Sequence, residues 1–494
     1  MFSCIILVVM AKFIFHIQSW EKPAHIIILV IALVLRIGLA LVNREANDPH
    51  MEVVQWILKY NELPIQSSGD CWECFQPKLF YASVVALIRT LNLTDPDSQI
   101  MIAQLLNALV GLLMIGYAYF FIRSLPFDNR PAKLLAMGIV ALNPGLVSIN
   151  IQATNDTFAI TFSFIAVFYA YRLVTIQDEH VGPVKSWAEL GLSSLFAALA
   201  ILAKTNALVT VFAIMITFLI KASAHRAGKF YPRAFLFLVI SATLVIPNPL
   251  SQYIINYQQF GTPVTLTINV EKQPLPYFFK HTETHRPGIL SIQDGFFTFK
   301  LLELLREPQN NSSNKEFPAH RTSFWSLLYA RTHFIQFNQW PPSWFTTSET
   351  IRNLGRIIYI FALFPSLALA IGIAAEIFAF LRTFWNKPRT LVTSFPQNLA
   401  AFHGAGLFFA LLVGFLGFQV LYAIQYRIYT VIKAIFIFPA WPSLLFFYLL
   451  GIHALHKKAS QILSWLQHLI MISSGGLLIL YVLDNLALFV QLMR

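Results

Sequence analysis

The sequence predicts an all-α protein that crosses a membrane many times. Of its 494 residues, 57% are hydrophobic and 12% are charged, and the mean hydropathy of +0.62 is far above that of soluble chains. About eleven segments approach the roughly 20 apolar residues that a helix needs to span a bilayer. The net charge of +12 fits Lys and Arg retained in cytoplasmic loops. No basic stretch interleaved with aromatic residues favours a nucleic acid partner.

The predicted spans follow one another along the chain with one long interruption. They lie near residues 24–42, 98–121, 133–149, 156–175, 187–203, 205–221, 233–249, 355–382, 401–424, 428–450 and 461–488. We therefore divide the chain into an N-terminal membrane module at 1–249, a polar insert at 250–354 and a C-terminal set of helices at 355–494. Residues 2–15 are apolar but short, so an interfacial helix, a signal-like segment and an extra span all stay open.

Short connections rich in Lys and Arg predict the orientation of these spans. The basic clusters are Arg123 with Arg130 and Lys133, Arg172 with Lys185, Lys221 with Arg226, Lys229 and Arg233, Arg382 with Lys387 and Arg389, and Lys457 with Lys458. Placing all of them in the cytosol puts the first loop, residues 43–97, and the insert at 250–354 on the opposite side. Within the first loop, the apolar run Pro77–Leu91 is short for a span, so we expect a re-entrant or interfacial helix there.

The insert at 250–354 is rich in Pro, Asn, His and aromatic residues. Because irregular backbone cannot face lipid, we expect this insert to form a compact cap on the side of the first loop. Its polar clusters are His281 with His285 and Arg286, His320 with Arg321, and Arg331 with His333. Their spacings fit no single ligand-bearing helix, so a solvated or acceptor-binding surface is favoured over a metal site.

Asp48, in the first loop at residues 43–97, is the first carboxylate that could take part in a reaction. Asp48 precedes Pro49, and an apolar face follows that includes Met51, Val54 and Leu58. Asp before Pro at the first helical position predicts that Asp48 caps a helix. A carboxylate at a helix N-terminus is stabilised in its ionised form, which is the form that a general base requires.

Two of the three cysteines form a Cys-x-x-Cys pair, Cys71 and Cys74, in the same loop. No second ligand pair follows at zinc-finger spacing, and no thioredoxin-like pattern surrounds the pair. Outside the cytosol, a local disulfide or two packed thiols is therefore favoured over a metal site.

The order of motifs resembles that of the membrane glycosyltransferases of the C fold, in particular the protein O-mannosyltransferases and aminoarabinose transferases of glycosyltransferase family 39. The matching features are Arg36, Asp48, a helix that reaches Pro64, the run Gln76-Pro77-Lys78-Leu79-Phe80-Tyr81, then Leu142-Asn143-Pro144, Asn155-Asp156 and Lys204. The chain departs from the family where Pro49 replaces a frequent Glu and Lys78 replaces a second proline. The first departure puts a metal or acceptor role for a second carboxylate in doubt, and the second places a cation where a phosphate could bind.

The resemblance implies an enzyme that transfers a sugar from a dolichyl- or undecaprenyl-phosphate donor to an acceptor hydroxyl, with inversion. It places the active site on the periplasmic side of a bacterial inner membrane or on the luminal side of the endoplasmic reticulum. Asp48 is then the expected base, with Glu73 in reserve. The acceptor, a protein, a glycan or a lipid, stays open. No cofactor is implied, and the absence of clustered carboxylates beside Asp48 argues against a metal without excluding one.

Cations near this site would stabilise the leaving phosphate. The candidates are Lys78, Lys204 and Arg427. For Lys204 the alternative is a side chain that extends to the membrane interface. The residues expected to position the substrate are His50, Glu73, Gln76, Tyr81, Asn155 and Asp156. For Asn155 and Asp156 a plain helix cap is an equal alternative.

Two other functions stay open. A transporter or flippase of a lipid-linked or anionic substrate would bury charged residues within its spans and interrupt helices in paired positions. A non-catalytic subunit of a membrane complex would have no cavity beside its loop carboxylate.

Overall fold

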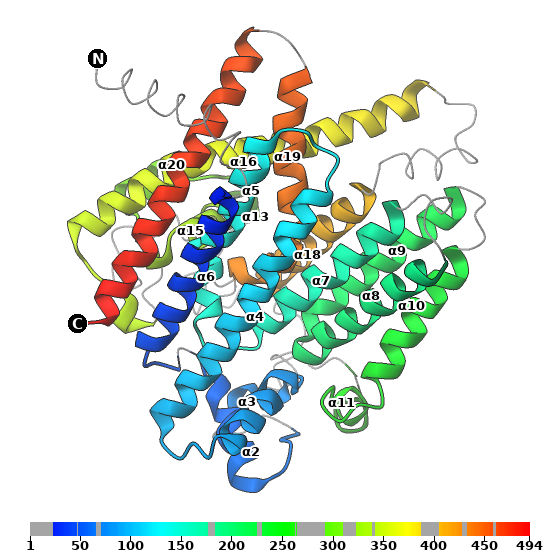
Figure 1. Ribbon diagram of the computed structural model, residues 1–494, viewed down its shortest axis with the longest axis vertical. Coiled ribbons are helices and arrows are strands. Elements are labelled where there is room, and N and C mark those ends of the chain that lie inside the picture. The colour runs from blue at the N-terminus through cyan, green and yellow to red at the C-terminus, as the bar shows by residue number, and fades with distance from the viewer. Residues whose placement is uncertain are drawn as a thin grey trace.

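The computed structural model describes twelve stretches of the chain. They are residues 23–46, 48–65, 71–175, 183–224, 230–261, 263, 292–309, 323–337, 341–386, 405–426, 432–457 and 461–494. In these stretches the regular elements are α-helices and short 3-10 helices (Figure 1), as the hydropathy pattern predicts.

Nine helices in the described residues are long and apolar enough to cross a bilayer. They are Pro23–Val42, α4 (Pro96–Ser124), α7 (Asp156–Thr175), α8 (Pro183–Ala203), α9 (Leu208–Ala224), α16 (Glu349–Asn386), α18 (Ala405–Tyr426), α19 (Trp441–Lys457) and α20 (Gln461–Leu492). The pair α5 (Arg130–Leu142) and α6 (Pro144–Asn150), bent by 43°, makes a tenth if it counts as one span. The predicted number of eleven is therefore not confirmed in the described part of the chain.

Two predicted spans differ from the structure because of proline. The span expected at 233–249 is α10 (Phe230–Val245), a helix of 16 residues that ends just before Pro247 and Pro249. Within the described residues, the span expected at 428–450 begins at Phe438, and residues 428–431 lie outside them. The 3-10 turn η8 (Ala434–Phe436) precedes this span, and the 3-10 turn η9 (Phe438–Ala440) forms its start before α19 begins. Proline lacks the N–H that continues a helix, so it is favoured in the first turn, although the long helix α16 does contain Pro365 in its interior.

Close helix crossings hold the bundle together. The most buried spans are α7 and α19, and α16 packs on both α19 and α20. Where α16 crosses α19, a Cβ atom on Gly372 would lie 1.9 Å from the carbonyl oxygen of Phe447, and one on Gly451 would lie 1.9 Å from that of Ala368. Glycine is required on both helices because their backbones are in contact there.

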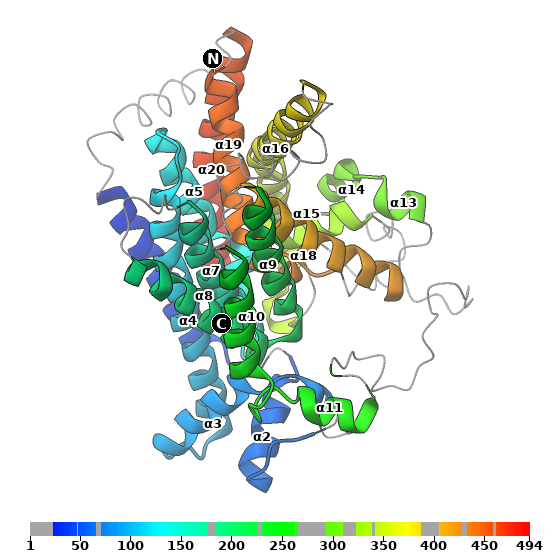
Figure 2. The ribbon, with the colours of Figure 1, turned by 90° about the vertical axis from the view of Figure 1, so that its right-hand side faces the viewer.

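The first loop folds into short helices at one end of the bundle. They are α2 (His50–Tyr60), the 3-10 turn η1 (Trp72–Phe75) and α3 (Leu79–Thr90), and α11 (Tyr253–Phe260) of the insert lies at the same end (Figures 1 and 2). The short helix expected within Pro77–Leu91 is thus present as α3. The backbone N–H of Lys78 donates to Leu250 O over 2.7 Å, which joins the first loop to the start of the insert.

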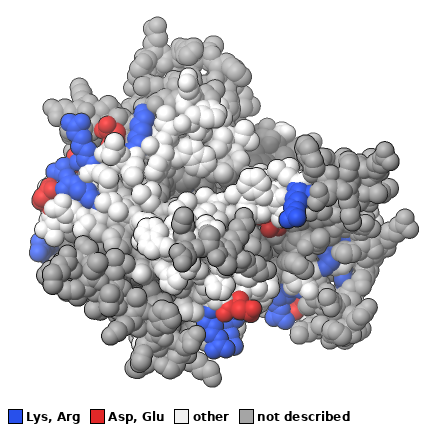
Figure 3. Space-filling view, turned by 90° about the horizontal axis from the view of Figure 1, so that it is seen from above, with Lys and Arg blue, Asp and Glu red and all other residues white. Residues whose placement is uncertain are grey.

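The described part of the insert is divided between two places. Unlike α11, helix α15 (Phe324–His333) packs against α6 and α16. The prediction of one compact cap is therefore not confirmed. Seen from above, the described surface is largely uncharged, with Lys and Arg in a few separate groups near its edge (Figure 3).

Candidate active site

Asp48 lies directly before helix α2, but its side chain does not cap that helix. Pro49 is the N-cap residue and no side chain caps α2. The predicted cap is wrong because the helix begins one residue later than expected. The carboxylate is about one-third exposed, and its Oδ2 atom lies 3.8 Å from Nε2 of His50. Asp48 is therefore partly exposed to solvent and lies near an imidazole.

His50 connects Asp48 to helix α3. Its Nδ1 atom lies 2.7 Å from the hydroxyl of Tyr81, and both side chains are buried. Burial, together with the carboxylates of Glu73, Asp48 and Asp156, raises the pKa of Tyr81 well above its usual value. Tyr81 therefore keeps its proton and stays hydrogen-bonded to Nδ1 of His50. The other ring nitrogen of His50, Nε2, faces Asp48.

A disulfide joins Cys71 and Cys74 across the turn η1, with 5.5 Å between their Cα atoms. The predicted local disulfide is therefore present. The ammonium of Lys78 lies just beyond this turn and donates to Cys74 O over 2.5 Å and to Gln76 O over 2.6 Å. The Lys78 side chain is fully buried. Burial lowers the pKa of Lys78 well below its usual value, and the charge of Glu73 partly opposes this effect.

The second loop, which we define as residues 151–155 between α6 and α7, leads into Asp156, and this carboxylate forms an ion pair. Nζ of Lys204 lies 2.7 Å from Oδ1 of Asp156, and their side chains are 12% and 4% exposed. Oδ2 of Asp156 accepts from the hydroxyl of Thr154 over 3.0 Å. The Lys204 ammonium also lies 5.5 Å from the ring centre of Phe436. Lys204 thus points inward to a carboxylate.

Amide side chains join the two loops. Asn155 donates to Ala203 O over 3.1 Å and to Gln76 Oε1 over 3.3 Å. Gln76 in turn donates to Glu73 Oε2 over 2.8 Å. Tyr81 interacts electrostatically with both Asp48 and Asp156. The structure therefore brings together all the predicted site residues that it describes.

Some predicted residues lie outside the described part of the chain. They are Arg427, His281, His285, Arg286, His320 and Arg321. Of the predicted polar cluster at Arg331 and His333, the imidazole of His333 is hydrogen-bonded to the hydroxyl of Tyr481. The described residues contain no group of three or more His, Cys, Asp or Glu that could hold a metal ion.

Lys433 lies close enough to the candidate site to act on Asp156, and sequence reasoning did not select it. Its side chain is exposed, and it interacts electrostatically with Asp156. It lies at the start of η8, three residues before Phe436. In the sequence, Lys433 is a single lysine before an apolar segment. This pattern is weak evidence for a site, because lysines are common at the membrane interface in any membrane protein.

Arg36 supports the second loop from within the membrane module. It is fully buried, and it donates to Asn150 Oδ1 over 2.8 Å and to Ala141 O over 2.7 Å. A Cβ atom on Gly111 would lie 2.4 Å from the Asn150 side chain. Arg36 therefore holds the end of α6, just before the loop that carries Asn155 and Asp156.

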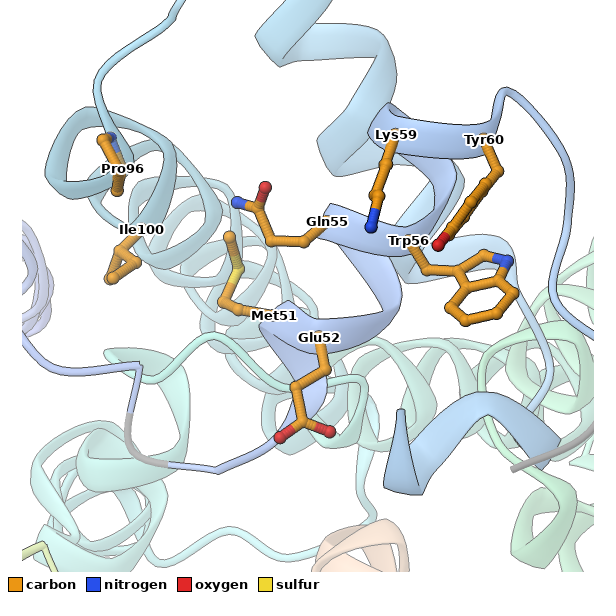
Figure 4. Close-up of a pocket in the computed structure, with 8 residues that line it drawn as sticks. All are labelled: Met51, Glu52, Gln55, Trp56, Lys59, Tyr60, Pro96 and Ile100. Carbon is orange, nitrogen blue, oxygen red and sulfur yellow. The ribbon is translucent and has the colours of Figure 1, made fainter. Parts of the chain in front are cut away.

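An open groove of about 490 Å³ runs along the outer side of α2 to the start of α4 (Figure 4). It is lined by Met51, Glu52, Gln55, Trp56, Lys59, Tyr60, Pro96 and Ile100. The rings of Trp56 and Tyr60 are 4.5 Å apart. The groove begins within one helical turn of His50 and combines apolar rings with polar groups.

Comparison with known proteins gives one family and a set of solved structures. Residues 84–250 match the family model described as dolichyl-phosphate-mannose-protein mannosyltransferase. No curated protein matches the chain. The structure of the Archaeoglobus fulgidus oligosaccharyltransferase tethered to an acceptor peptide is 14% identical, with a TM-score of 0.51, and the match covers 95% of this chain and 55% of that one.

Two further solved structures are similar to the chain. The Archaeoglobus fulgidus oligosaccharyltransferase AglB, in complex with an inhibitory peptide and a dolichol-phosphate, is 12% identical with a TM-score of 0.49, covering 95% of this chain and 56% of that one. ArnT from Cupriavidus metallidurans, bound to undecaprenyl phosphate, is 15% identical with a TM-score of 0.37, covering 89% and 78%. This chain spans about half the length of the oligosaccharyltransferases.

Proposed function

We propose that this chain is a glycosyltransferase of the membrane family whose model, described as dolichyl-phosphate-mannose-protein mannosyltransferase, its residues 84–250 match. It transfers a sugar from a polyprenyl-phosphate donor to an acceptor hydroxyl, with inversion at the anomeric carbon. The observation that carries this proposal is that Asp48, a partly exposed carboxylate, and Asp156, which pairs with Lys204, both act electrostatically on the buried Tyr81.

Asp48 acts as the general base in this mechanism. The acceptor oxygen attacks the anomeric carbon while its proton passes to Asp48. The bond from that carbon to the phosphate oxygen breaks, and the electron pair leaves with the polyprenyl phosphate. One carboxylate is sufficient for such a single displacement. His50 is held by Tyr81 and faces Asp48 with its Nε2 atom at 3.8 Å, so the imidazole is close enough to interact electrostatically with the carboxylate. Glu73 remains the reserve base.

Cations stabilise the leaving phosphate. Lys78, Lys204 and Arg427 are the predicted set, and the exposed Lys433 joins them because it interacts electrostatically with Asp156. A cation in a poorly hydrated site stabilises developing negative charge more strongly than one in water. Asn155 and Asp156 position the loop that presents Lys204, through their bonds to Ala203 O and to the lysine itself.

The donor and acceptor follow from the family alone. The donor is dolichyl- or undecaprenyl-phosphate sugar, and the acceptor is a protein, glycan or lipid hydroxyl. The end of the molecule that carries α2 and α3 faces the periplasm or the lumen. A flippase remains the alternative, because Arg36 and Asp484 are fully buried within spans. Each is bonded to a backbone group, Arg36 to Ala141 O and Asp484 to Ile335 N, which also suits a structural role.

Mass spectrometry of lipid that co-purifies with the protein tests the donor class, and a bound polyprenyl phosphate is the expected result.

The variant Asp48→Asn tests whether Asp48 is the general base. We expect transfer to fall by about 100- to 10,000-fold, the usual contribution of a general base, with an unchanged unfolding temperature. Glu62→Gln, at an exposed carboxyl after α2, is the matched control and should keep full activity. A folded and fully active Asp48→Asn enzyme would refute the assignment. Movement of lipid-linked sugar across vesicles without transfer would favour the flippase.

A further inference from the structure

The disulfide-closed turn at residues 71–76 lies directly against the candidate site. We propose that the Cys71–Cys74 disulfide is a positioning element for donor binding, because it fixes the carbonyl oxygens that hold the Lys78 ammonium. This inference rests on the proposed function, since it assigns a task to a bond that the transfer mechanism itself does not use. It also makes the enzyme dependent on an oxidised cysteine pair.

The turn presents three acceptors from four neighbouring residues. Cys74 O and Gln76 O both accept from Lys78 Nζ, and the Glu73 carboxylate accepts from the Gln76 side chain. The Gln76 backbone N–H closes the turn by donating to Glu73 O over 3.1 Å. The Cys74 carbonyl belongs to a half-cystine, so the disulfide fixes one of the two acceptors of the ammonium directly.

A turn of this size needs an external constraint. The 3-10 helix η1 has only four residues, and such short helices have poor hydrogen-bond geometry and an unfavourable nucleus. A disulfide over three residues removes alternative conformations of the loop. Both cysteines are fully buried, so the bond also packs beneath the site. The carbonyls of the turn are therefore held in one direction.

Lys78 depends on these carbonyls for its charge. Its side chain is fully buried, and burial of an ammonium is costly unless its donors are bonded. The Lys78 backbone has a separate anchor, because its N–H donates to the carbonyl oxygen of Leu250 at the start of the insert. Loss of the disulfide should therefore leave the backbone of α3 in place and release only the ammonium. The first effect would be on donor phosphate binding rather than on folding.

A double-mutant cycle tests the coupling. Its members are Cys71→Ala/Cys74→Ala, Lys78→Met and the triple variant, and the measured quantities are the affinity for undecaprenyl phosphate, the donor KM and kcat. We expect the cysteine variant to lose about tenfold or more in affinity, as for one hydrogen bond to a charged group, with a smaller change in kcat. In the Lys78→Met background the same change should have no further effect. Additive losses in the two backgrounds would overturn the proposal, because a purely structural disulfide acts on both equally.

Amine labelling of Lys78, followed by mass spectrometry, provides a readout that needs no substrate. We expect Lys78 to be protected in the oxidised protein and labelled in the cysteine variant, and likewise after reduction of the wild-type protein. Dithiothreitol supplies the two electrons and two protons and becomes a cyclic disulfide, while Cys71 and Cys74 become thiols. The third cysteine gives the control, Cys4→Ala. Equal protection in all forms would refute the positioning role even if the enzyme transfers sugar. Changed protection in a protein that binds no polyprenyl phosphate would instead refute only the proposed function.

Discussion

Removal of the lysine from the buried ion pair tests whether Lys204 serves the fold as well as the site. In Lys204→Met the methionine keeps the apolar stem beside Phe436 but leaves Asp156 without its cation. The Asp156 side chain is only 4% exposed, and Thr154 still donates to its Oδ2 atom. Breaking a buried pair by removing one partner costs about 3 to 5 kcal/mol. We expect the lower end of this range, because Lys433 and His50 still act on Asp156.

Unfolding in mixed micelles with rising dodecyl sulfate, followed by tryptophan fluorescence, measures this loss. A second change decides its cause: in Lys204→Met/Asp156→Asn no charge is buried, so most of the lost stability should return. Lys59→Met, at an exposed position on α2, should change stability by about 0.5 kcal/mol or less. If Lys204→Met alone is as stable as the wild type, the ion pair with Asp156 does not stabilise the fold. If the double variant is no more stable than the single one, the uncompensated charge is not the reason.

Two further predictions concern the fold. Gly451→Ala should prevent normal assembly, because its Cβ would lie 1.9 Å from Ala368 O, whereas Gly417→Ala meets nothing within 4 Å and should be neutral; the yield of monodisperse protein in detergent distinguishes them. Burial lowers the pKa of His333 to about 3, so the unfolded chain binds a proton below pH ~6.5 that the folded protein does not. Stability should fall by about 2 kcal/mol between pH 6.5 and 5, and a His333→Phe variant that retains this pH dependence would contradict the assignment.

Hydropathy predicts the helices well because a bilayer requires about 20 apolar residues in each span. It fails where proline sets a helix boundary, at Pro247 after α10 and at Pro439 before α19. The mean hydropathy of a segment carries no information about the N–H that proline lacks. It also predicts the short helix α3, which is too brief to span. The presence of these helices can therefore be predicted from local composition and segment length, whereas their exact ends cannot.

Contacts between side chains in the candidate site cannot be predicted from local composition. Lys204 and Asp156 are 48 residues apart, and Gln76 and Asn155 are 79 apart. No local pattern relates such residues, because their contact depends on how α7, α8 and the first loop pack. The family resemblance places them in the same region without saying which atoms pair. The cap assigned to Asp48 is wrong for the opposite reason: the local signal is strong, but the helix starts one residue later.

The difference between Asp48 and Asp156 bears on the proposal that Asp48 is the general base. Asp156 is 4% exposed and its charge is balanced by Lys204 at 2.7 Å. A carboxylate in this state interacts strongly with its cation, so taking a proton would break the pair and leave a buried ammonium. Asp48 is 34% exposed and faces His50 at 3.8 Å, beyond hydrogen-bonding distance, so protonation of Asp48 disrupts no short contact. Proton transfer in a single displacement therefore costs less at Asp48, and Asp156 is better suited to holding Lys204 in place.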